Sequence, residues 1–478
     1  MKKFPIFLAG EEVMLPTQYT IMNPATGEPL ASVSDAGYAE AMRALDLAEK
    51  SFDGWRKTPP AKRGDVLLRA YHAMQEQASS IAELITSENG KPLEEAKIEV
   101  MFSSEYLRWF AEEARRTFGE TVPTPARGRR FFTTLESIGV VGAITPWNFP
   151  ANMITRKCAP ALAAGCPVVL KPAPDTPLTA LRIAKILHDA GLPKGVLSVL
   201  PTSRAPEISK AFFDHPATRA ISFTGSTPVG KILMAQAASR VIRVGMELGG
   251  NAPILVFGDA DLDLAVRHTI AIKLLRVGGE SCICANRIYV EDPIYDDFRS
   301  RIWKEMQKLK MGPGTEPKVD LGPLINAKAV QKIEGLLEDA KKLGAKIAQV
   351  PMTQKRGFFM PITLAEAIPD NARLANEEIF GPVVPLYRFS TEQEAISRAN
   401  GVPFGLAAYL FTQNLSRAFR VGEALEAGLI GINDCGGYVH EIPMGGYKQS
   451  GIGREGGREG IREYLEIKSW NLGIKEAG

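Results

Sequence analysis

Ala220-Ile-Ser-Phe-Thr-Gly-Ser-Thr-Pro-Val-Gly230 is the stretch that decides the fold of this chain. Its β-branched and aromatic first half passes directly through glycine into a segment of helical length, the pattern of a strand that leads into a helix. Three earlier runs, Val140 to Ile144, Pro167 to Leu170 and Val196 to Leu200, have the same texture and are separated by further helical lengths. Strands that alternate with helices predict a parallel α/β sheet.

A second α/β region follows Gly249-Gly250, with strands expected over Ile254 to Phe257 and Arg287 to Val290 and a helix over Asp261 to Arg276 between them. The first hundred residues are expected to be mostly helical, because apolar residues from Leu67 to Ile85 recur at spacings of three and four. Two α/β layers in sequence predict two lobes with a cleft between them.

Two short pieces fit neither lobe. The Pro- and Arg-rich stretch Gly119 to Arg130 leads into Phe131 to Leu135, and Tyr464 to Trp470 is a strand-like run near the end of the chain. Protruding strands expose unpaired backbone groups, so both pieces are candidates for arms that pair with another subunit. A surface hairpin within one subunit is the alternative.

Composition excludes several classes of protein. The 478 residues carry 57 Lys and Arg against 54 Asp and Glu, a net charge of +3, which demands neither nucleic acid nor an anionic membrane as a partner. The long uncharged run Ser137 to Thr155 contains Pro146 and Pro150 and predicts a buried strand and loop rather than a membrane span. Five cysteines in so long a chain form no disulfide framework, which indicates a reducing compartment and favours a cytoplasmic enzyme.

The glycine-containing turn Gly225 to Gly230 predicts a phosphate site, because free N–H groups and the helix dipole at a helix start attract anions. Followed by Lys231, it imitates the loop of nucleoside triphosphatases. Ile232 stands where that loop needs a hydroxyl for magnesium, so this alternative is weak. Simple turn geometry is the other alternative for the glycines.

Cys282 is the strongest candidate nucleophile. It lies in Gly278-Gly-Glu-Ser-Cys-Ile-Cys284, between an expected helix and an expected strand, where a flexible turn displays side chains. Thiolates are the best side-chain nucleophiles, although a lone cysteine is more often a small buried hydrophobe. No histidine nearby completes a zinc site or supplies the base of a cysteine hydrolase, so no metal is expected.

Two further residues suit the same chemistry. Glu247 is surrounded by apolar residues and glycine at the junction of the lobes, where partial desolvation would raise its pKa into the range of a general base. Asn148 lies between Pro146 and Pro150, and a loop fixed by two prolines makes its amide a credible preorganised donor to an oxyanion. An exposed strand-end glutamate and a turn-capping asparagine are the alternatives.

Together these segments resemble the aldehyde dehydrogenase superfamily. The likeness runs from Asn23-Pro-Ala-Thr-Gly27 to Ser450-Gly-Ile-Gly-Arg-Glu455, and Met153-Ile-Thr-Arg-Lys157 with Cys282-Ile-Cys-Ala-Asn-Arg287 looks most like its succinic semialdehyde dehydrogenase branch. The motifs stand in register as Trp147-Asn148, Lys171-Pro172, Phe223 to Ser226, Glu247 to Gly250, Cys282 and Glu378 to Pro382.

The resemblance implies the architecture. A Rossmann-like cofactor-binding domain would comprise residues 1–118 and 138–246, and an α/β catalytic domain residues 247–440. Residues 119–137 and 460–478 would form a β oligomerisation arm, and dimers or tetramers of identical chains are expected.

The resemblance also assigns roles. Cys282 would attack the aldehyde, Asn148 and the Cys282 N–H would hold the oxyanion, and Glu247 would activate the water that hydrolyses the thioester. For NAD or NADP, Lys171 would bind the adenosine ribose, Glu378 the nicotinamide ribose and Phe380 the ring. The pyrophosphate would lie against Trp147, Gly225, Ser226 and Gly230. Pro174 replaces a glutamate that selects NAD in many members, so the choice between the cofactors stays open.

For the substrate, Arg156 and Arg276 match two arginines that bind the distal carboxylate in that branch, and two guanidinium groups favour an anionic tail. Pairing of each arginine with a protein carboxylate is the alternative. The branch's serine contact is missing from Asp434 to Glu441, which offers Tyr438, Val439 or His440 instead. The distal group of the substrate is therefore expected to be the carboxylate of succinic semialdehyde or another anion. The alternatives are a sulfonate, as in sulfolactaldehyde, a phosphate, or a longer or hydroxylated carboxylate.

Two further expectations complete the sequence-based picture. Cys284 matches the second thiol of relatives in which a disulfide with the nucleophile switches activity off. Because the superfamily includes structural proteins without activity, a non-catalytic relative is a rival, against which the joint presence of Cys282, Glu247 and Asn148 argues.

Overall fold

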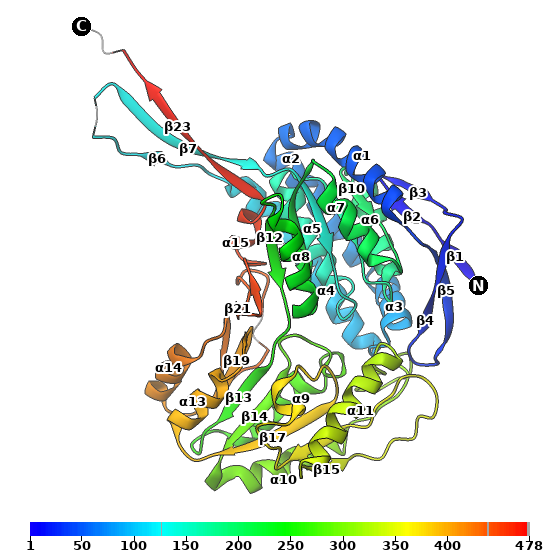
Figure 1. Cartoon of the computed structure of the whole chain (residues 1–478), viewed down its shortest axis with the longest axis vertical. Helices are drawn as coiled ribbons and strands as arrows, with labels where there is room; N and C mark the ends of the chain where they lie inside the picture. The colour runs from blue at the N-terminus through cyan, green and yellow to red at the C-terminus, as the bar shows by residue number, and fades with distance from the viewer. Residues whose placement is uncertain (126, 437–438, 476–478) are drawn as a thin grey trace.

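The first lobe is organised around a mostly parallel sheet (Figure 1). The computed structural model describes residues 1–125, 127–436 and 439–475. The sheet order is β22-β12-β11-β8-β9-β10-β2-β3, and β8 to β12 pair in parallel in the spatial order of a Rossmann sheet. The strands are β8 (Val140–Ile144), β9 (Val168–Lys171), β10 (Leu197–Val199), β11 (Thr218–Thr224), β12 (Arg243–Glu247), β2 (Ile6–Leu8), β3 (Glu11–Val13) and β22 (Gly451–Ile452).

The strand order reverses between β8 and β11, which are neighbours at the centre of this sheet. Loops that leave the carboxyl ends of such strands diverge and create a ligand crevice. The loop after Ile144 carries Trp147 and Asn148, and the loop after Thr224 carries Gly225 and Ser226. The topology therefore brings two of the motifs to one crevice.

The second lobe has its own sheet, in the order β15-β16-β17-β14-β13-β19-β20. All neighbouring strands are parallel except β15 and β16, which run antiparallel. The two predicted α/β layers are therefore confirmed. The strands are β13 (Ala252–Val256), β14 (Ala285–Glu291), β15 (Lys346–Gln349), β16 (Thr363–Glu366), β17 (Val383–Phe389), β19 (Ala407–Phe411) and β20 (Leu429–Ile432).

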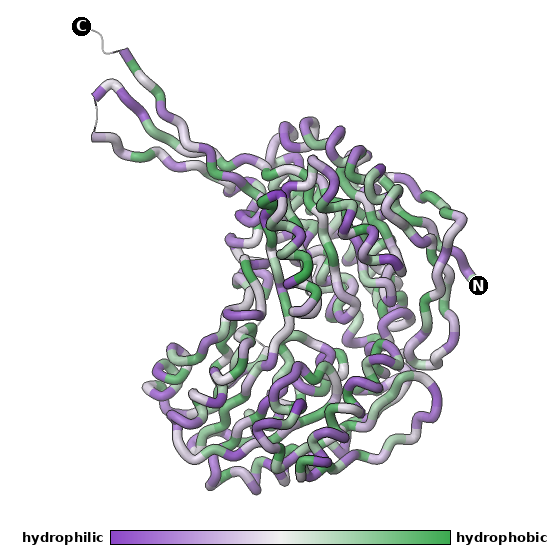
Figure 2. Tube along the Cα trace, in the orientation of Figure 1, coloured by the Kyte–Doolittle hydropathy of each residue, from purple (hydrophilic) through white to green (hydrophobic). Residues whose placement is uncertain are grey.

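Helices cover both faces of each sheet, because alternate strand residues point to opposite sides. Val141 and Leu170 join one hydrophobic cluster, whereas Val140 and Val169 join another across the sheet. Figure 2 shows hydrophobic residues concentrated along the inner strands of both lobes. The helices are α1 (Tyr38–Lys57), α2 (Pro60–Glu76), α3 (Ala78–Asn89), α4 (Leu93–Glu113), α5 (Asn152–Ala164), α6 (Pro177–Asp189), α7 (Ala205–Asp214), α8 (Thr227–Ala238), α9 (Leu262–Lys273), α10 (Tyr295–Met306), α11 (Ala327–Lys342), α12 (Arg373–Asn376), α13 (Glu392–Asn400), α14 (Leu415–Ala424) and α15 (Glu459–Arg462).

A β arm projects from the first lobe (Figure 1). β7 (Arg129–Ser137) pairs antiparallel along its whole length with β23 (Leu465–Gly473), and β6 (Thr121–Val122) pairs with the other edge of β7. The two arm segments that the sequence predicted thus pair with each other within one chain. The arm leaves large apolar side chains exposed, among them Phe118, Val122, Ile467, Trp470 and Leu472.

The N-terminal strands were not predicted. Residues 2–34 form strands instead of continuing the helical region, since short strands of three to seven residues with irregular burial leave no clear alternation in the sequence. They are β2 and β3 of the first sheet, together with β1 (Lys2–Phe4), β4 (Gln18–Asn23) and β5 (Glu28–Ser34), which form a separate sheet. A further pair joins β18 (Phe404–Gly405) to β21 (Tyr447–Lys448). Among the described residues, no helix combines the length and the apolar character that crossing a membrane requires.

Candidate active site

Cys282 lies on a sharply turned loop between α9 and β14. After α9 the chain enters a short 3-10 turn, Val277–Gly279, whose residues have φ angles of 48°, 56° and 87°. Positive φ strains a β-branched residue such as Val277, so surrounding contacts must impose it. The helix predicted to reach Arg276 therefore ends at Lys273, and the turn leaves the Cys282 side chain partly exposed.

Gly250 supports this loop from behind. A Cβ atom at Gly250 would lie 2.3 Å from the carbonyl oxygen of Cys282, far inside contact distance. A side chain at this position would therefore push the cysteine loop away. The requirement explains why glycine ends the Glu247-Leu-Gly-Gly250 segment, and it places that segment directly against Cys282.

A cavity of about 480 Å³ has Cys282 in its wall. The other walls come from α4, the start of α5, α9 and the three residues Cys435, Gly436 and Met444, and they are largely apolar. Arg156 and Arg276 also line it. The fold therefore brings the candidate nucleophile and both candidate anion-binding residues to one small-molecule cavity.

The two arginines differ in their surroundings. Arg156 lies with its Nε 2.8 Å from a carboxylate oxygen of Glu455. Arg276 stacks its guanidinium over the Phe149 ring, 4.9 Å from the centroid, and its buried Nε has no hydrogen-bond partner among the described residues. The alternative of pairing with a protein carboxylate therefore applies to Arg156, whereas Arg276 retains donors for a ligand.

Asn148 is held against the cysteine loop. Its side-chain Nδ2 donates to the carbonyl oxygen of Glu280 at 2.9 Å, two residues before Cys282. The residue is buried, and its Oδ1 has no hydrogen-bond partner in the described part of the chain. An amide nitrogen carries two donors, so one N–H remains after the bond to Glu280.

Glu247 is the last residue of β12 and only 4% exposed. Neither of its carboxylate oxygens has a hydrogen-bond partner within the described residues. The pKa of Glu247 is raised to about 8, chiefly by burial and then by the carboxylate of Glu455, while Arg156 and Lys157 oppose the shift. A buried carboxyl group without hydrogen bonds and with this pKa suits a base that works near neutral pH.

Burial also raises the pKa of the Cys282 thiol, to about 12. The nearby Glu378 and Glu247 carboxylates act in the same direction, and Arg156 and Arg276 oppose them. The cysteine is therefore a neutral thiol in this state, and its proton must leave before or during any attack on a substrate.

Most of the candidate cofactor residues lie at the carboxyl edge of the first sheet. Lys171 ends β9, and burial lowers the pKa of its ammonium group to about 8, with Asp175 opposing the shift. Ser226 is the exposed residue directly before α8. Gly230 packs closely against Leu248, because a Cβ atom at this position would lie 2.5 Å from the Leu248 side chain. Gly225 donates its N–H to the carbonyl of Glu247 at 3.0 Å.

Pro174 is half-buried, and the acidic residue Asp175 follows it in the sequence. One carboxylate oxygen of Asp175 accepts a hydrogen bond of 3.3 Å from Nδ2 of Asn326, the residue before α11. The carboxylate that could substitute for the missing glutamate is therefore already engaged with the second lobe.

Glu378 and Phe380 face the same region from the second lobe. Glu378 accepts the N–H of Gly250 at 3.1 Å, and burial raises the pKa of its carboxyl to about 7. Phe380 has a positive φ of 61°, and its ring meets Trp147 edge to face with centroids 5.6 Å apart. The contact joins Phe380, which is expected to bind the nicotinamide, to residues 145–151, the loop that carries Asn148 and is called the asparagine loop below.

The structure does not place the predicted substrate residues of the loop from Asp434 to Glu441 in the cavity wall. Tyr438 lies outside the described residues. His440 is not among the residues that line the cavity; its ring packs against Phe102, Tyr106 and Trp109 at centroid distances of 6.5, 6.2 and 6.0 Å. Burial lowers the pKa of this histidine.

Sequence reasoning missed five polar residues that line the cavity: Glu95, Glu99, Asn152, His268 and Ser281. Nδ1 of His268 accepts the N–H of Cys435 at 3.2 Å. His268 and Ile272 are four residues apart on α9, and this helical spacing could have indicated a shared face, whereas Arg276 lies beyond the end of the helix.

Cys284 is fully buried, and its thiol lies 3.9 Å from the carbonyl oxygen of Lys273. Burial raises the pKa of the Cys284 thiol. All five cysteines, including Cys282 and Cys284, are free thiols.

The chain belongs to the aldehyde dehydrogenase family, whose model matches residues 13–470. The predicted family, enzyme class and fold are therefore confirmed.

Three relatives show the level of similarity. The 3-sulfolactaldehyde dehydrogenase of Pseudomonas putida is 47% identical, over 95% of this chain and 93% of the relative. The succinate-semialdehyde dehydrogenase (NADP(+)) GabD of Escherichia coli strain K12 is 46% identical, over 95% and 94%. The crystal structure of succinate-semialdehyde dehydrogenase from Burkholderia pseudomallei is 43% identical, with a TM-score of 0.96 over 98% of both chains.

Proposed function

We propose that this protein oxidises a short anionic aldehyde to the carboxylic acid with NAD or NADP. The observation that carries the proposal is the cavity of about 480 Å³ that Cys282, Arg156 and Arg276 line together. A nucleophile at one position and a guanidinium group with unused donors at another match a molecule with an aldehyde at one end and an anion at the other.

Cys282 forms the covalent bond to the substrate. The thiol proton passes to a water molecule, the sulfur attacks the aldehyde carbon, and the π electrons of the C=O bond move to the carbonyl oxygen, which becomes an oxyanion. The remaining N–H of the Asn148 side chain and the backbone N–H of Cys282 stabilise that charge. When bound, NAD or NADP accepts the hydride that leaves the substrate carbon.

Glu247 completes the reaction. As the base, it removes a proton from water, whose oxygen attacks the thioester carbon, and the carbon–sulfur bond breaks to release the acid and the Cys282 sulfur. The absence of hydrogen bonds to both carboxylate oxygens in the described residues supports this role, because a base engaged with protein donors would be less basic.

The cofactor residues fit an NAD(P) dinucleotide. The exposed start of α8 at Ser226 offers N–H groups to a pyrophosphate. Lys171 stands at the adenosine end, and Glu378 and Phe380 at the nicotinamide end. Pro174 favours acceptance of NADP, because it carries no carboxylate to repel a 2′-phosphate, and the hydrogen bond from Asn326 holds the carboxylate of the neighbouring Asp175 toward the second lobe.

The distal anion is a carboxylate or a sulfonate. The relatives support both, because one acts by name on 3-sulfolactaldehyde and others on succinate semialdehyde at similar identity. His268 and Glu95 in the cavity wall would also accommodate a hydroxyl group on the substrate.

The arm supports assembly of identical chains. Phe118, Ile467 and Trp470 are 73%, 71% and 43% exposed on or beside the arm strands, which is unusual for large apolar side chains. We infer that a second copy covers them in a dimer or tetramer. Light scattering would give a mass of two or four chains, and a monomer would contradict the inference.

Initial rates test the function. NAD and NADP are each offered with succinic semialdehyde, sulfolactaldehyde, glutaric semialdehyde and an uncharged aldehyde, to the wild type and to Cys282→Ala. The proposal requires reduction of at least one cofactor, a preference for anionic aldehydes by orders of magnitude in kcat/KM, and no turnover by the variant. Equal rates with uncharged aldehydes would contradict the anionic substrate.

A further inference from the structure

A buried ion pair lies beneath the asparagine loop. Lys91, between α3 and α4, places its Nζ 2.5 Å from Oε2 of Glu99 on α4, and the two side chains are 0% and 3% exposed. Burying both charges carries a large desolvation cost that their attraction alone often fails to recover. The other hydrogen bonds of the two side chains therefore indicate which part of the structure the ion pair holds in place.

Those other hydrogen bonds all reach the backbone of residues 147–152. Lys91 Nζ donates to the carbonyl oxygen of Asn148 at 2.9 Å. Glu99 Oε1 accepts the N–H groups of Ala151 and Asn152 at 2.8 and 3.3 Å. The ammonium group also lies 4.3 Å from the centroid of the Phe149 ring. The loop is thus held at its middle and at its junction with α5.

Asn89, two residues before Lys91, adds another contact. Its Nδ2 donates to the carbonyl oxygen of Trp147 at 3.1 Å. The short segment Asn89 to Lys91 therefore binds two successive carbonyl groups of the asparagine loop. These contacts fix the peptide planes on both sides of the Asn148 Cα atom.

We propose that Lys91, charge-paired with Glu99, is a positioning residue that sets the orientation of the Asn148 amide. The proposal rests on the function proposed above, in which that amide stabilises the oxyanion. Lys91 is not among the residues that line the cavity, so it acts through Asn148 rather than on the substrate. An oxyanion donor must sit within a few tenths of an ångström of its place, and a misplacement of about 1 Å costs on the order of 10² in rate.

The first test compares Lys91→Met with a matched control. Glu88 is an equally buried carboxylate that binds the start of another helix, accepting the N–H groups of Leu178 and Thr179 at 2.7 and 2.9 Å. Lys91→Met should lower kcat about 10- to 100-fold and change KM for the aldehyde less than about threefold. Glu88→Gln should lower the melting temperature and leave kcat within about twofold. Lys91→Arg should restore part of the rate, because it keeps the charge and the donors.

A double-mutant cycle separates positioning from general damage. If Lys91 acts through Asn148, adding Lys91→Met to Asn148→Ala should cost less than about threefold beyond Asn148→Ala alone. Losses that multiply would overturn the proposal. Where Lys91→Met fails to fold, Lys91→Gln takes its place in the cycle with the same expectations; Glu99 is unsuitable because it lines the substrate cavity.

Crystal structures supply a readout that does not need activity. In Lys91→Met the Asn148 side chain should leave the carbonyl of Glu280, whereas in Glu88→Gln it should stay. An unmoved Asn148 in Lys91→Met would overturn the proposal even if the enzyme were inactive with every aldehyde. Full activity of Asn148→Ala would instead contradict the proposed oxyanion role. The crystal structures alone would then test whether Lys91 positions the Asn148 side chain.

Discussion

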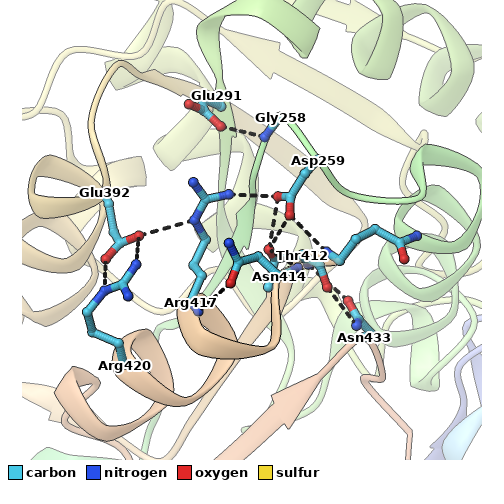
Figure 3. A network of polar contacts seen from close by, with 10 residues as sticks. Gly258, Asp259, Glu291, Glu392, Thr412, Asn414, Arg417, Arg420 and Asn433 are labelled. Carbon is cyan, nitrogen blue, oxygen red and sulfur yellow. Dashed lines mark hydrogen bonds and ion pairs between the residues drawn. The ribbon is translucent and has the colours of Figure 1, made fainter.

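The two carboxylates that flank β13 in the sequence have opposite surroundings: Asp259, which follows the strand, is exposed and hydrogen-bonded, whereas Glu247, which precedes it, is buried. Asp259 accepts hydrogen bonds from Oγ1 of Thr412 at 2.9 and 2.8 Å, from the N–H of Gln413 at 3.1 Å and from Arg417 at 2.7 Å (Figure 3). The oxygens of Glu247 have no partner within the described residues. The Asp259 carboxylate is thus part of a hydrogen-bonded network, whereas the Glu247 carboxyl group is free to accept hydrogen bonds.

The difference indicates which buried groups are kept for the reaction although they lower the stability of the fold. An unbonded buried carboxyl group costs free energy, and proteins keep such groups mainly where a ligand or a reaction uses them. Asn148 Oδ1 and Ser281 Oγ, close to Cys282 in the sequence or in space, are likewise without partners in the described chain. The Asp259 carboxylate, by contrast, accepts hydrogen bonds at both oxygens and so ties Arg417 of α14 to the end of β13.

The two carboxyl groups also respond to pH in opposite directions. Burial raises the pKa of Glu247 to about 8, so its contribution to stability is present at low pH and is lost as the pH rises through that value. Burial opposes ionisation of Asp259, but the hydrogen bonds from Thr412 and the charge of Arg417 lower its pKa below the ordinary value. Its contribution is present at neutral pH and is lost as the pH falls through the acid range.

The largest expected effect comes from Cys282→Ala. Without the sulfur no covalent intermediate forms, and turnover should fall by more than about 10⁴-fold. The melting temperature should remain within a few degrees of the wild type, because the side chain is small and partly exposed. Steady-state rates and thermal melts on the same samples check this, and a residual rate above a hundredth of wild type would contradict it.

Glu247→Gln should lower kcat about 10²- to 10⁴-fold, because only the hydrolysis of the thioester loses its base. A rapid burst of reduced cofactor, of one equivalent per active subunit, should precede the slow steady state in stopped-flow absorbance. A variant that lost the burst together with the steady state would place Glu247 in the first half-reaction instead.

The wild-type rate of that hydrolysis should rise with pH and reach half its maximum at about pH 8, since the base must be ionised. Single-turnover decay of the acyl enzyme across the pH range would measure it. In Glu247→Gln this rise should disappear, and a rise that persisted unchanged would assign the titration to another group.

Arg276→Met should raise KM for an anionic aldehyde about 10- to 100-fold, the usual worth of a hydrogen bond to a charged group. KM for a chain-matched uncharged aldehyde should not change, because methionine still covers Phe149. Arg156→Met is the comparison: it leaves Glu455 without its arginine, so its main effect should be on stability. Equal increases of KM for charged and uncharged substrates would contradict anion recognition by Arg276.

Asp259→Asn should have the smallest effect on activity. Loss of the charge weakens the bonds from Thr412 and Arg417 and should cost about 1 to 3 kcal/mol of stability. The value of kcat per folded subunit should stay within about twofold of the wild type. Chemical denaturation followed by fluorescence would measure the first quantity, and a large drop in kcat would show that the network reaches the active centre.

The sequence predicted the fold where patterns are local. The β-branched runs from Val140 to Thr224 identified the parallel strands, because buried strands lack polar residues. It failed for residues 2–34, where strands of three to seven residues pair mostly with one another but show irregular burial, so the sequence lacks a clear alternation. The pairing of β7 with β23 could not be predicted for a different reason, since more than 320 residues separate partners such as Lys468 and Glu136.

The site was predictable where a motif carries the chemistry. Cys282, Arg156 and Arg276 line one cavity. The different bonding of the two arginines could not be predicted, because Glu455 approaches from a segment about 300 residues away. His440 illustrates the converse: the loop was identified, but the aromatic side chains of α4 hold the histidine outside the cavity lining, a tertiary contact with no local signal.

The most direct test of the central claim measures kcat and melting temperature for Glu247→Gln and Asp259→Asn side by side at about pH 8. The unbonded carboxyl group should prove important for activity and the bonded one for stability. Glu247→Gln should therefore lose at least about 10²-fold in kcat without melting earlier, and Asp259→Asn should melt earlier with kcat nearly unchanged. The reverse pattern, with Glu247→Gln unstable but active, would contradict the account.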